Sequence, residues 1–153
     1  MLNAREVFAR VKRLKAFAGM EESDFRSLYY KQEFTPAAGG APTVQQPQPF
    51  PNGGIVLGIT ATAFIPNAIP LATNGRLRHL FQIDFSYTGN EALVVNGPVT
   101  ADALMGGGDS DLFPLRELIL APNQQILCRT ANNTNGALTV HVIYHTLVYR
   151  LGA

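Results

Sequence analysis

His141 and His145 are the residues whose type and spacing first suggest chemistry, because two imidazoles four positions apart on a helix can share one metal ion. Both lie in the run ALTVHVIYHTLVYRL, whose alternating and β-branched residues favour a strand. On a strand, four residues at about 3.3 Å each separate the two rings by roughly 13 Å, so one metal ion does not reach both. We therefore interpret them as strand histidines with structural or interface roles.

Asp109 and Asp111, in the segment GGGDSD, form a second possible cation site. A calcium loop of the EF-hand type needs further oxygen ligands and a glutamate at its twelfth position, and Glu117 comes too early. The glycines before these aspartates are not followed by the Lys-Ser/Thr pair of a phosphate-binding loop. We interpret the segment as a plain turn and predict no metal site.

Cys128 is the single cysteine, so the sequence excludes an internal disulfide and a multi-cysteine zinc site. It lies in the strand-like run ILCRT, which predicts a buried small side chain rather than a reactive thiol. No serine elbow, no paired carboxylates in a cleft-like pattern and no convincing Cys–His pair are present. We therefore predict that the protein is not an enzyme, with no catalytic residues and no cofactor.

The composition limits the classes of partner. A formal net charge of +1 over 153 residues gives no general attraction to nucleic acid or to anionic membranes. No apolar run approaches the length of a membrane span, and the charged N-terminus lacks the apolar region of a signal peptide. Only 15% of the residues are charged, which suits either a subunit inside an assembly or a β surface rich in Gly, Asn and Thr.

The chain divides into three segments by composition. Residues 1–34 contain every lysine and are patterned as helices, residues 35–54 are rich in Pro, Gly and Gln, and residues 55–153 alternate as strands do. We predict a helical docking arm, an extended tether and a β body, in that order. The tether has five prolines and four glycines, which exclude a helix or a central strand.

The arm is predicted to contain two short helices. The first has an apolar stripe at helical spacing and ends near Gly19, and the second spans about residues 22–32 with Phe25, Leu28 and Tyr29 on one face. Helices this short are marginal alone in water and need a surface to lie on. The interleaved basic residues are interpreted as a solvated face, with phosphate or an acidic partner as the alternative. The predicted partner-binding residues are Val7, Val11, Leu14, Phe17, Phe25 and Leu28.

The body reads as short strands separated by turns, which predicts a β-sandwich or jelly roll. Residues 77–87 alternate most clearly, with His79, Phe81 and Phe85 on one face. The other predicted strands cover residues 55–64, 92–95, 99–104, 112–120, 125–130 and 138–151. The fold class is therefore mainly β, a jelly-roll-like antiparallel sandwich preceded by the arm and the tether.

Three segments of the body follow a recognisable order. An aromatic-rich strand (GRLRHLFQIDFSYTG, 75–89) comes first, then a Phe-Pro segment with Pro-Asn and Asn/Thr turns (LFPLRELILAPNQQILCRTANNTNG, 112–136), then a last strand with an aromatic-His pair and a Tyr-Arg end (VHVIYHTLVYRL, 140–151). In this order they resemble a family of small tailed-phage virion proteins with a jelly-roll body, over about half of the chain. The arm and tether lie outside the resemblance.

The resemblance implies a non-enzymatic capsid cement or decoration protein that binds and stabilises major capsid subunits in the phage head, after synthesis in the host cytoplasm. We expect partners among the major capsid protein or other virion subunits, and a homo-oligomer. The alternative is a vertex, portal, collar or small fibre component with a receptor- or carbohydrate-binding β-sandwich. A cupin-like enzyme is a further alternative, in which His79 would meet His141 or His145 across strands and hold a metal ion.

Overall fold

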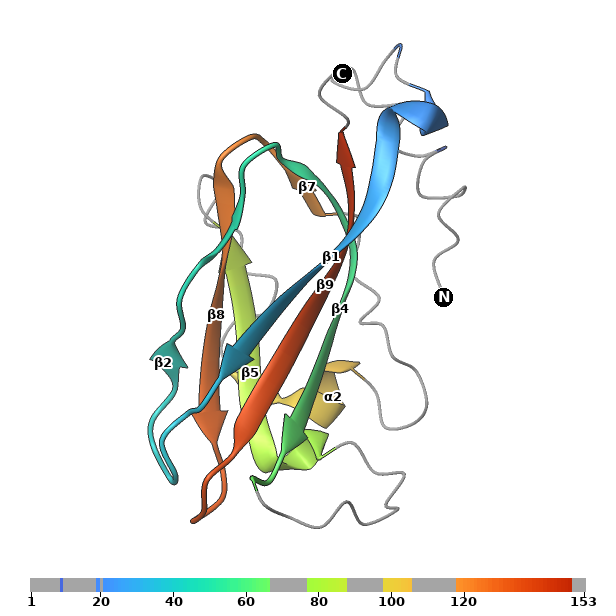
Figure 1. Cartoon of the computed structure of the whole chain (residues 1–153). Coiled ribbons are helices and arrows are strands. Elements are labelled where there is room, and N and C mark those ends of the chain that lie inside the picture. Colours follow the sequence, from blue (N-terminus) through green and yellow to red (C-terminus); the bar gives the residue numbers. More distant parts are fainter. Residues whose placement is uncertain are drawn as a thin grey trace.

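The computed structural model describes residues 21–66, 77–87, 98–105 and 118–149, together with Ala9 and Gly19. Within these residues the chain is mainly β and almost free of helix (Figure 1). The strands are β1 (Phe25–Phe34), β2 (Thr43–Val44), β3 (Gln48–Phe50), β4 (Gly54–Phe64), β5 (Phe81–Tyr87), β6 (Val99–Thr100), β7 (Leu118–Leu120), β8 (Gln124–Asn132) and β9 (Thr139–Tyr149). The short helical turns are η2 (Glu22–Asp24), η3 (Arg78–Leu80) and α2 (Ala101–Met105).

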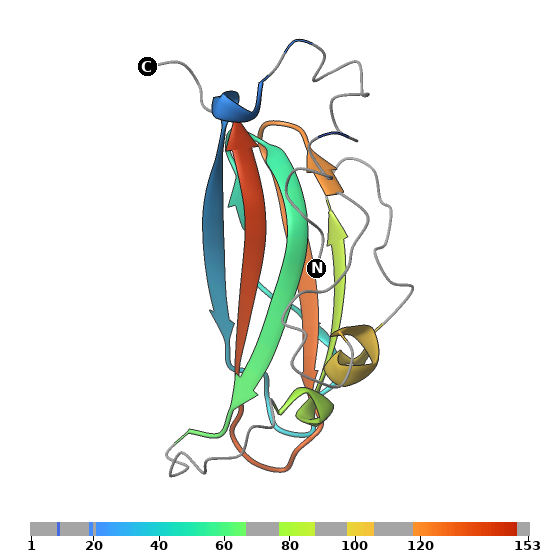
Figure 2. The ribbon, with the colours of Figure 1, turned by 90° about the vertical axis from the view of Figure 1, so that its right-hand side faces the viewer.

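The strands form two antiparallel sheets. The first sheet has the order β1-β9-β4-β7, and the second has the order β2-β8-β5-β6, with β3 also paired to β8. Figure 2 shows β1, β9 and β4 side by side in one layer, with β8 and β5 in the layer behind. The longest ladder, β1 with β9, runs without a register break from the Phe25–Tyr149 pair to the Phe34–Val140 pair.

The pairings are nested along the chain. β1 pairs with β9, β2 and β3 pair with β8, β4 pairs with β7, and β5 pairs with β6. Each strand of the first half therefore pairs, in reverse order, with a strand of the second half. Two further ladders, β4 with β9 and β5 with β8, complete the two sheets.

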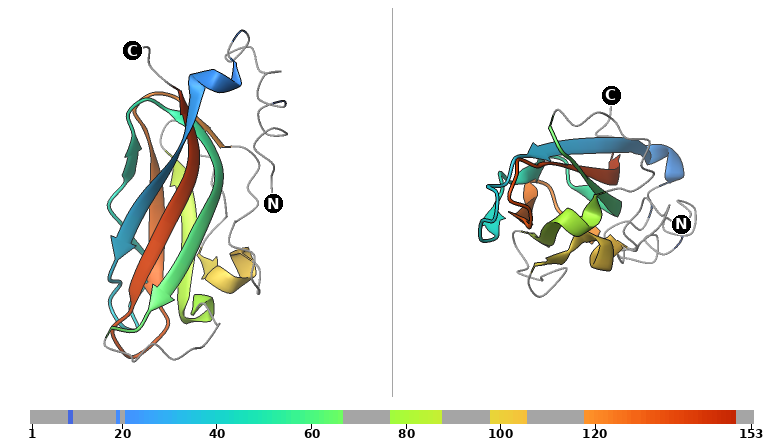
Figure 3. Two further views of the ribbon diagram at one scale, coloured as in Figure 1. Left: turned by 45° about the vertical axis from the view of Figure 1, so that its right-hand side comes forward. Right: turned by 90° about the horizontal axis from the view of Figure 1, so that it is seen from below.

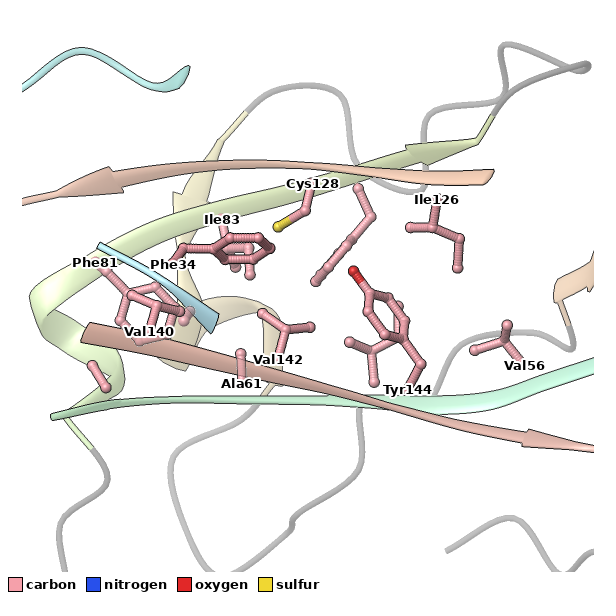
Figure 4. Close-up of a cluster of buried hydrophobic side chains, with 14 of the residues drawn as sticks. Phe34, Val56, Ala61, Phe81, Ile83, Ile126, Cys128, Val140, Val142 and Tyr144 are labelled. Atoms are coloured by element: carbon pink, nitrogen blue, oxygen red, sulfur yellow. The ribbon is translucent and has the colours of Figure 1, made fainter. Parts of the chain in front are cut away.

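The core lies between the two sheets (Figure 4). Alternate residues of β9 face inward from the first sheet, and alternate residues of β5 and β8 face inward from the second, as strand geometry requires. Tyr144 lies at the centre and meets the rings of Phe50 and Phe85 edge-on, at centroid distances of 6.0 and 6.3 Å. Each large side chain buried in this way contributes about 1.5–3 kcal/mol. The largest fully buried side chains are Tyr144, Phe50, Phe81, Phe85, Ile55, Ile59, Ile83, Ile126, Leu138 and Val56.

The predicted helix over residues 22–32 is wrong. Only Glu22–Asp24 form a helical turn, and Phe25–Phe34 form a strand of ten residues. The aromatic residues of this stretch suit a strand, and Leu28, Tyr30, Gln32 and Phe34 also alternate at period two. Pairing with β9 supplies the backbone hydrogen bonds that a short isolated helix cannot keep in water. The first predicted helix lies outside the described residues.

Residues 35–54 form no helix, turn at Ala37–Gly40 and at Phe50–Gly53, and are docked on the body. The backbone N–H of Gln45 donates to the carbonyl of Cys128 at 2.7 Å, β2 and β3 pair with β8, and Phe50 is 1% exposed. The prolines are accommodated because β2 and β3 lie at the margin of their sheet, where a missing N–H is tolerated. The segments 25–34 and 35–54 thus supply strands to both sheets, rather than leading up to a body that begins at residue 55.

Four predicted body strands are confirmed with shifted ends: β4, β5, β8 and β9. The predicted strand over residues 99–104 is wrong beyond Thr100, because Ala101–Met105 form the helix α2. The predicted strand over residues 77–87 begins with the turn η3, so its regular alternation starts at Phe81. Of residues 112–120 the structure describes β7 alone, and residues 92–95 lie outside its description.

Candidate interaction surface

The outer face of the first sheet carries the polar and aromatic side chains that the core does not use. Along β9 the odd-numbered residues from His141 to Leu147 point outward, because the even-numbered residues from Val140 to Val148 are buried. In β1 the exposed residues Tyr29, Lys31 and Glu33 lie on this face, opposite His145, Ile143 and His141 respectively. β4 adds Thr60, Thr62 and Phe64 on the other side of β9.

At one end of this face lies a cluster of charged and aromatic groups. The Nε2 atom of His141 lies 2.9 Å from a carboxylate oxygen of Glu33, and that same oxygen lies 3.2 Å from the Nζ of Lys31. The ring of Phe64 lies against His141 at a centroid distance of 4.7 Å. The hydrogen bond from Lys31, with the nearby His141, holds the pKa of Glu33 below its ordinary value against the opposing effect of desolvation. Glu33 is therefore anionic at neutral pH.

In the middle of the face His145 lies between two partners. Its Nε2 atom is 3.1 Å from the hydroxyl oxygen of Thr60, and the ring of Tyr29 meets it edge-on at 4.8 Å. Burial lowers the pKa of His145, which favours the neutral imidazole. Tyr29 covers His145 while remaining 67% exposed itself, so it presents a large aromatic surface to the solvent.

The other end of the face is apolar. Ile55 is fully buried although it pairs with the outward-facing Leu147, and it packs with Phe25, Leu57 and Leu147. The register of β4 against β9 shifts between Val56 and Gly58, so Leu57 is an extra residue in the ladder. This bulge turns the start of β4 and gives the outer face a small apolar cluster of its own.

A groove of about 510 Å³ runs along the margin of β1. One wall is Lys31–Thr35, and the other is Gln45–Pro49. Gln32 crosses between the walls: its side-chain oxygen accepts a hydrogen bond from the buried Tyr144 hydroxyl at 2.6 Å, and its nitrogen donates to the carbonyl of Gln46 at 2.8 Å. The groove is therefore lined in part by four glutamines, one cation and one anion, and Gln32 connects it to the core.

The predicted partner-binding residues divide into two groups. Val7, Val11, Leu14 and Phe17 lie outside the described residues. Phe25 and Leu28 lie in β1, where residues three apart point to opposite faces of the sheet. The predicted common helical face of Phe25 and Leu28 is therefore wrong, and only Phe25 contributes to the outer face, within the apolar cluster.

The histidines do not assemble into a metal site in the part of the chain that the structure describes. Within those ranges no group of three His, Cys, Asp or Glu side chains is placed to hold an ion. His141 and His145 share the outer face, as strand parity predicts, while His79 lies in η3. Cys128 is fully buried, as predicted, and burial raises the pKa of its thiol well above the ordinary value. Asp109 and Asp111 lie outside the described ranges.

An ion pair between a buried aspartate and a partly exposed arginine lies on the second sheet. Asp84 of β5 is 2% exposed and directly opposite Arg129 of β8, whose Nε donates to a carboxylate oxygen at 3.0 Å and whose Nη2 contacts the other oxygen. This two-point contact satisfies the buried carboxylate. Because Arg129 contacts both oxygens of the buried carboxylate, we interpret the pair as a structural feature.

Sequence reasoning missed Tyr29, Lys31 and Glu33 as surface residues of a sheet. Their alternation with Leu28, Tyr30, Gln32 and Phe34 was the available signal, since residues of one parity are exposed and those of the other face inward. The assignment of this stretch to a helix concealed that signal. Phe64, which is 48% exposed, was likewise included only as the end of a body strand, and Ile65, which is 47% exposed, was not assigned to any strand.

The comparisons with known proteins found no relative. No family model, no curated protein and no solved structure matches the chain. Within the described ranges, no helix has the length and apolar character needed to span a membrane. The fold and the outer face of the first sheet are therefore the observations from which a function can be inferred.

Proposed function

We propose that this protein is a non-enzymatic structural subunit of a phage particle, a jelly-roll cement or decoration protein that binds major capsid subunits. The nested strand pairing is the observation that carries the proposal. If β2 and β3 are counted as one strand, eight strands pair first with last in two sheets, which is the order expected of two Greek keys rolled into a jelly roll. Viral capsid proteins commonly use that architecture.

The resemblance of residues 75–151 to tailed-phage virion proteins supports the same proposal. Jelly rolls also occur in lectins and cupins, so the surface chemistry has to distinguish a capsid protein from these two classes. His141 and His145 each contact a neighbouring side chain, Glu33 and Thr60, which favours a structural use of both imidazoles. A broad sheet face with aromatic, charged and apolar groups suits a protein partner better than a small substrate.

The capsid-contacting surface in this proposal is the outer face of the first sheet, together with the apolar residues of the arm. Phe64 and Tyr29 supply exposed apolar area there, and His141, Glu33 and Lys31 supply the polar rim. Many copies on a repeating lattice would hold the capsid without high affinity at any single contact, because avidity adds up over the linked sites.

Binding to capsids assembled from the major capsid protein of the same phage tests the proposal. We expect the full chain to co-sediment with such capsids at a fixed ratio and to raise their disassembly temperature. Phe64→Ala should weaken binding at least roughly tenfold, as expected for an interfacial aromatic. Val44→Ala is the matched control, since Val44 is 61% exposed but lies on the second sheet. Absence of the wild-type chain from the capsid pellet would rule out the proposal.

A receptor- or carbohydrate-binding β-sandwich is the second candidate, and one observation favours it. Tyr29 is an exposed aromatic on the same strand and face as Lys31 and Glu33, and a sugar ring can stack on such a side chain. A glycan array with the full chain distinguishes the two candidates. Specific glycan signals that disappear in Tyr29→Ala would support this candidate over the capsid proposal.

A further inference from the structure

The margin of the first sheet differs from the other sheet margins that the structure describes. β1 lies at the end of the order β1-β9-β4-β7, and no described strand pairs with its outer side (Figure 3). It has ten residues, no proline, no glycine and no register break. The other marginal strands β2, β3, β6 and β7 have two or three residues each, and β3 contains Pro49.

Proteins usually protect a long sheet margin from pairing, because its unpaired N–H and C=O groups are a template for another strand. In an antiparallel ladder, alternate residues of a marginal strand direct these groups away from their neighbour. Beside Lys31–Thr35 this margin borders the groove, whose other wall is the chain's own Gln45–Pro49. A long regular margin to which no described strand is paired indicates that the margin is used for pairing.

The charges of β1 indicate which strand is complementary to this margin. On the outer face β1 carries one cation and one anion, Lys31 and Glu33, two residues apart. Two copies related by a twofold axis pair antiparallel, and their sheet faces match only when opposed residues have the same parity. One such register places Lys31 of each copy opposite Glu33 of the other, with the axis at Gln32. The smallest shift that keeps the sheet faces matched moves one β1 by two residues along the other. In one direction this shift places Lys31 opposite Lys31, and in the other direction it places Glu33 opposite Glu33.

We propose that two copies of this chain associate through β1, with Gln32 on the twofold axis, so that the two first sheets become one continuous sheet. Opposite charges facing each other across strands attract and like charges repel, so the Lys31–Glu33 pattern selects this register over its neighbours. The inference goes beyond the proposed function and holds whether or not the protein is a virion component.

The Lys31–Glu33 contact within one copy can be replaced by Lys31–Glu33 contacts between two copies. Lys31 and Glu33 contact each other at 3.2 Å, but their side chains are 53% and 55% exposed. An exposed ion pair of this kind contributes little stability, so replacing it with two pairs across the axis has a small cost. Glu33 also retains His141 as a neighbour within its own copy, at 2.9 Å.

Charge reversal tests the register in the full-length protein. We expect sedimentation velocity to show a dimer for the wild type. Lys31→Glu and Glu33→Lys should each weaken the dimer at least roughly tenfold, because every attractive pair becomes repulsive. An equimolar mixture of these two variants should dimerise again, since an acidic margin then faces a basic one. Arg26→Glu is the matched control with the same change of charge, and it should leave the dimer intact, because Arg26 lies outside the paired stretch.

A second measurement uses only the wild-type chain. Chains labelled with heavy and light isotopes are mixed and treated with a carbodiimide, which joins a lysine to a carboxylate in direct contact. A crosslinked peptide that contains Lys31 from one label and Glu33 from the other is the expected product. The proposal is overturned if the wild type is a monomer at every concentration, or if the dimer forms without mixed-label crosslinks and is indifferent to both charge reversals.

Discussion

The hydroxyl of Tyr144 donates a hydrogen bond of 2.6 Å to the side-chain oxygen of Gln32, across the β9–β1 ladder. Through this contact the centre of the core is joined to the margin of the first sheet, and Gln32 passes the connection on to the carbonyl of Gln46. Burial raises the pKa of Tyr144 well above its ordinary value, so the hydroxyl keeps its proton and remains a donor.

Tyr144→Phe should lower the free energy of unfolding by about 1–2 kcal/mol, because Gln32 loses its donor while the ring stays packed. Urea unfolding followed by circular dichroism measures the change. Tyr29→Phe is the control, since it removes the hydroxyl of an exposed tyrosine on the neighbouring strand and should change stability by less than about 0.5 kcal/mol. Equal stabilities for the two variants would show that the Tyr144–Gln32 hydrogen bond does not stabilise the fold.

Gly53→Ala should be more destabilising than Gly39→Ala. Both glycines have positive φ, 63° and 59°, so alanine has a left-handed backbone cost of about 1–2 kcal/mol at either position. A Cβ on Gly53 would lie 2.4 Å from the carbonyl oxygen of Leu120, while a Cβ on Gly39 meets nothing within 4 Å. The difference between the two variants, roughly 1–3 kcal/mol by analogy with overpacking, is therefore the cost of that close approach. Thermal unfolding of both variants measures it, and identical losses would contradict the close approach at Gly53.

His145 should contribute to loss of stability on mild acidification. Because burial lowers its pKa in the folded protein, the unfolded chain binds the proton more readily. This contribution is fully present above the unfolded pKa of about 6.5 and is lost as the pH falls through the folded value. His145→Gln should make the dependence of stability on pH shallower just below pH 6.5. Unfolding midpoints measured from pH 7.5 to 5 test this, and parallel curves for wild type and His145→Gln would argue against it.

Under the capsid proposal, the double substitution Val11→Ala with Leu14→Ala should abolish binding to capsids while the β body stays folded. The two residues belong to the predicted apolar stripe of the arm, and their truncation removes the area that a neighbouring chain would cover. Co-sedimentation with capsids measures incorporation, and circular dichroism measures the fold. Lys12→Ala, within the same stretch but on the predicted solvated face, is the control. Undiminished incorporation of the double variant would show that this stripe does not dock.

Period-two alternation was enough to predict β4, β5, β8 and β9, because each of these strands buries one face and its pattern is local. β1 could not be assigned in the same way. Its Phe25, Leu28 and Tyr29 also fit helical spacing, and the partner that decides between the two patterns, β9, lies more than a hundred residues further along the chain. Local propensity is a weak guide where such a distant partner decides the structure.

The same limit applies to the candidate surface. The sequence placed His141 and His145 in one strand, and that part of the prediction is confirmed by β9. Their contacts Glu33 and Tyr29 come from the segment that was assigned to a helix, so the surface could not be assembled from the sequence. A surface built from two distant strands becomes visible only once their pairing is known.

Nested pairing also sets the order in which the chain can fold during synthesis. β1, the first of the described strands to leave the ribosome, has its partner in β9, the last of them. The first sheet therefore cannot close until β9 has been synthesised, and until then β1 has two open sides instead of one. Distant pairings of this kind make folding slow and expose the growing chain to aggregation. Production of the protein in quantity should therefore depend on slow translation, low temperature or chaperones that hold the N-terminal strand until the C-terminal strand arrives.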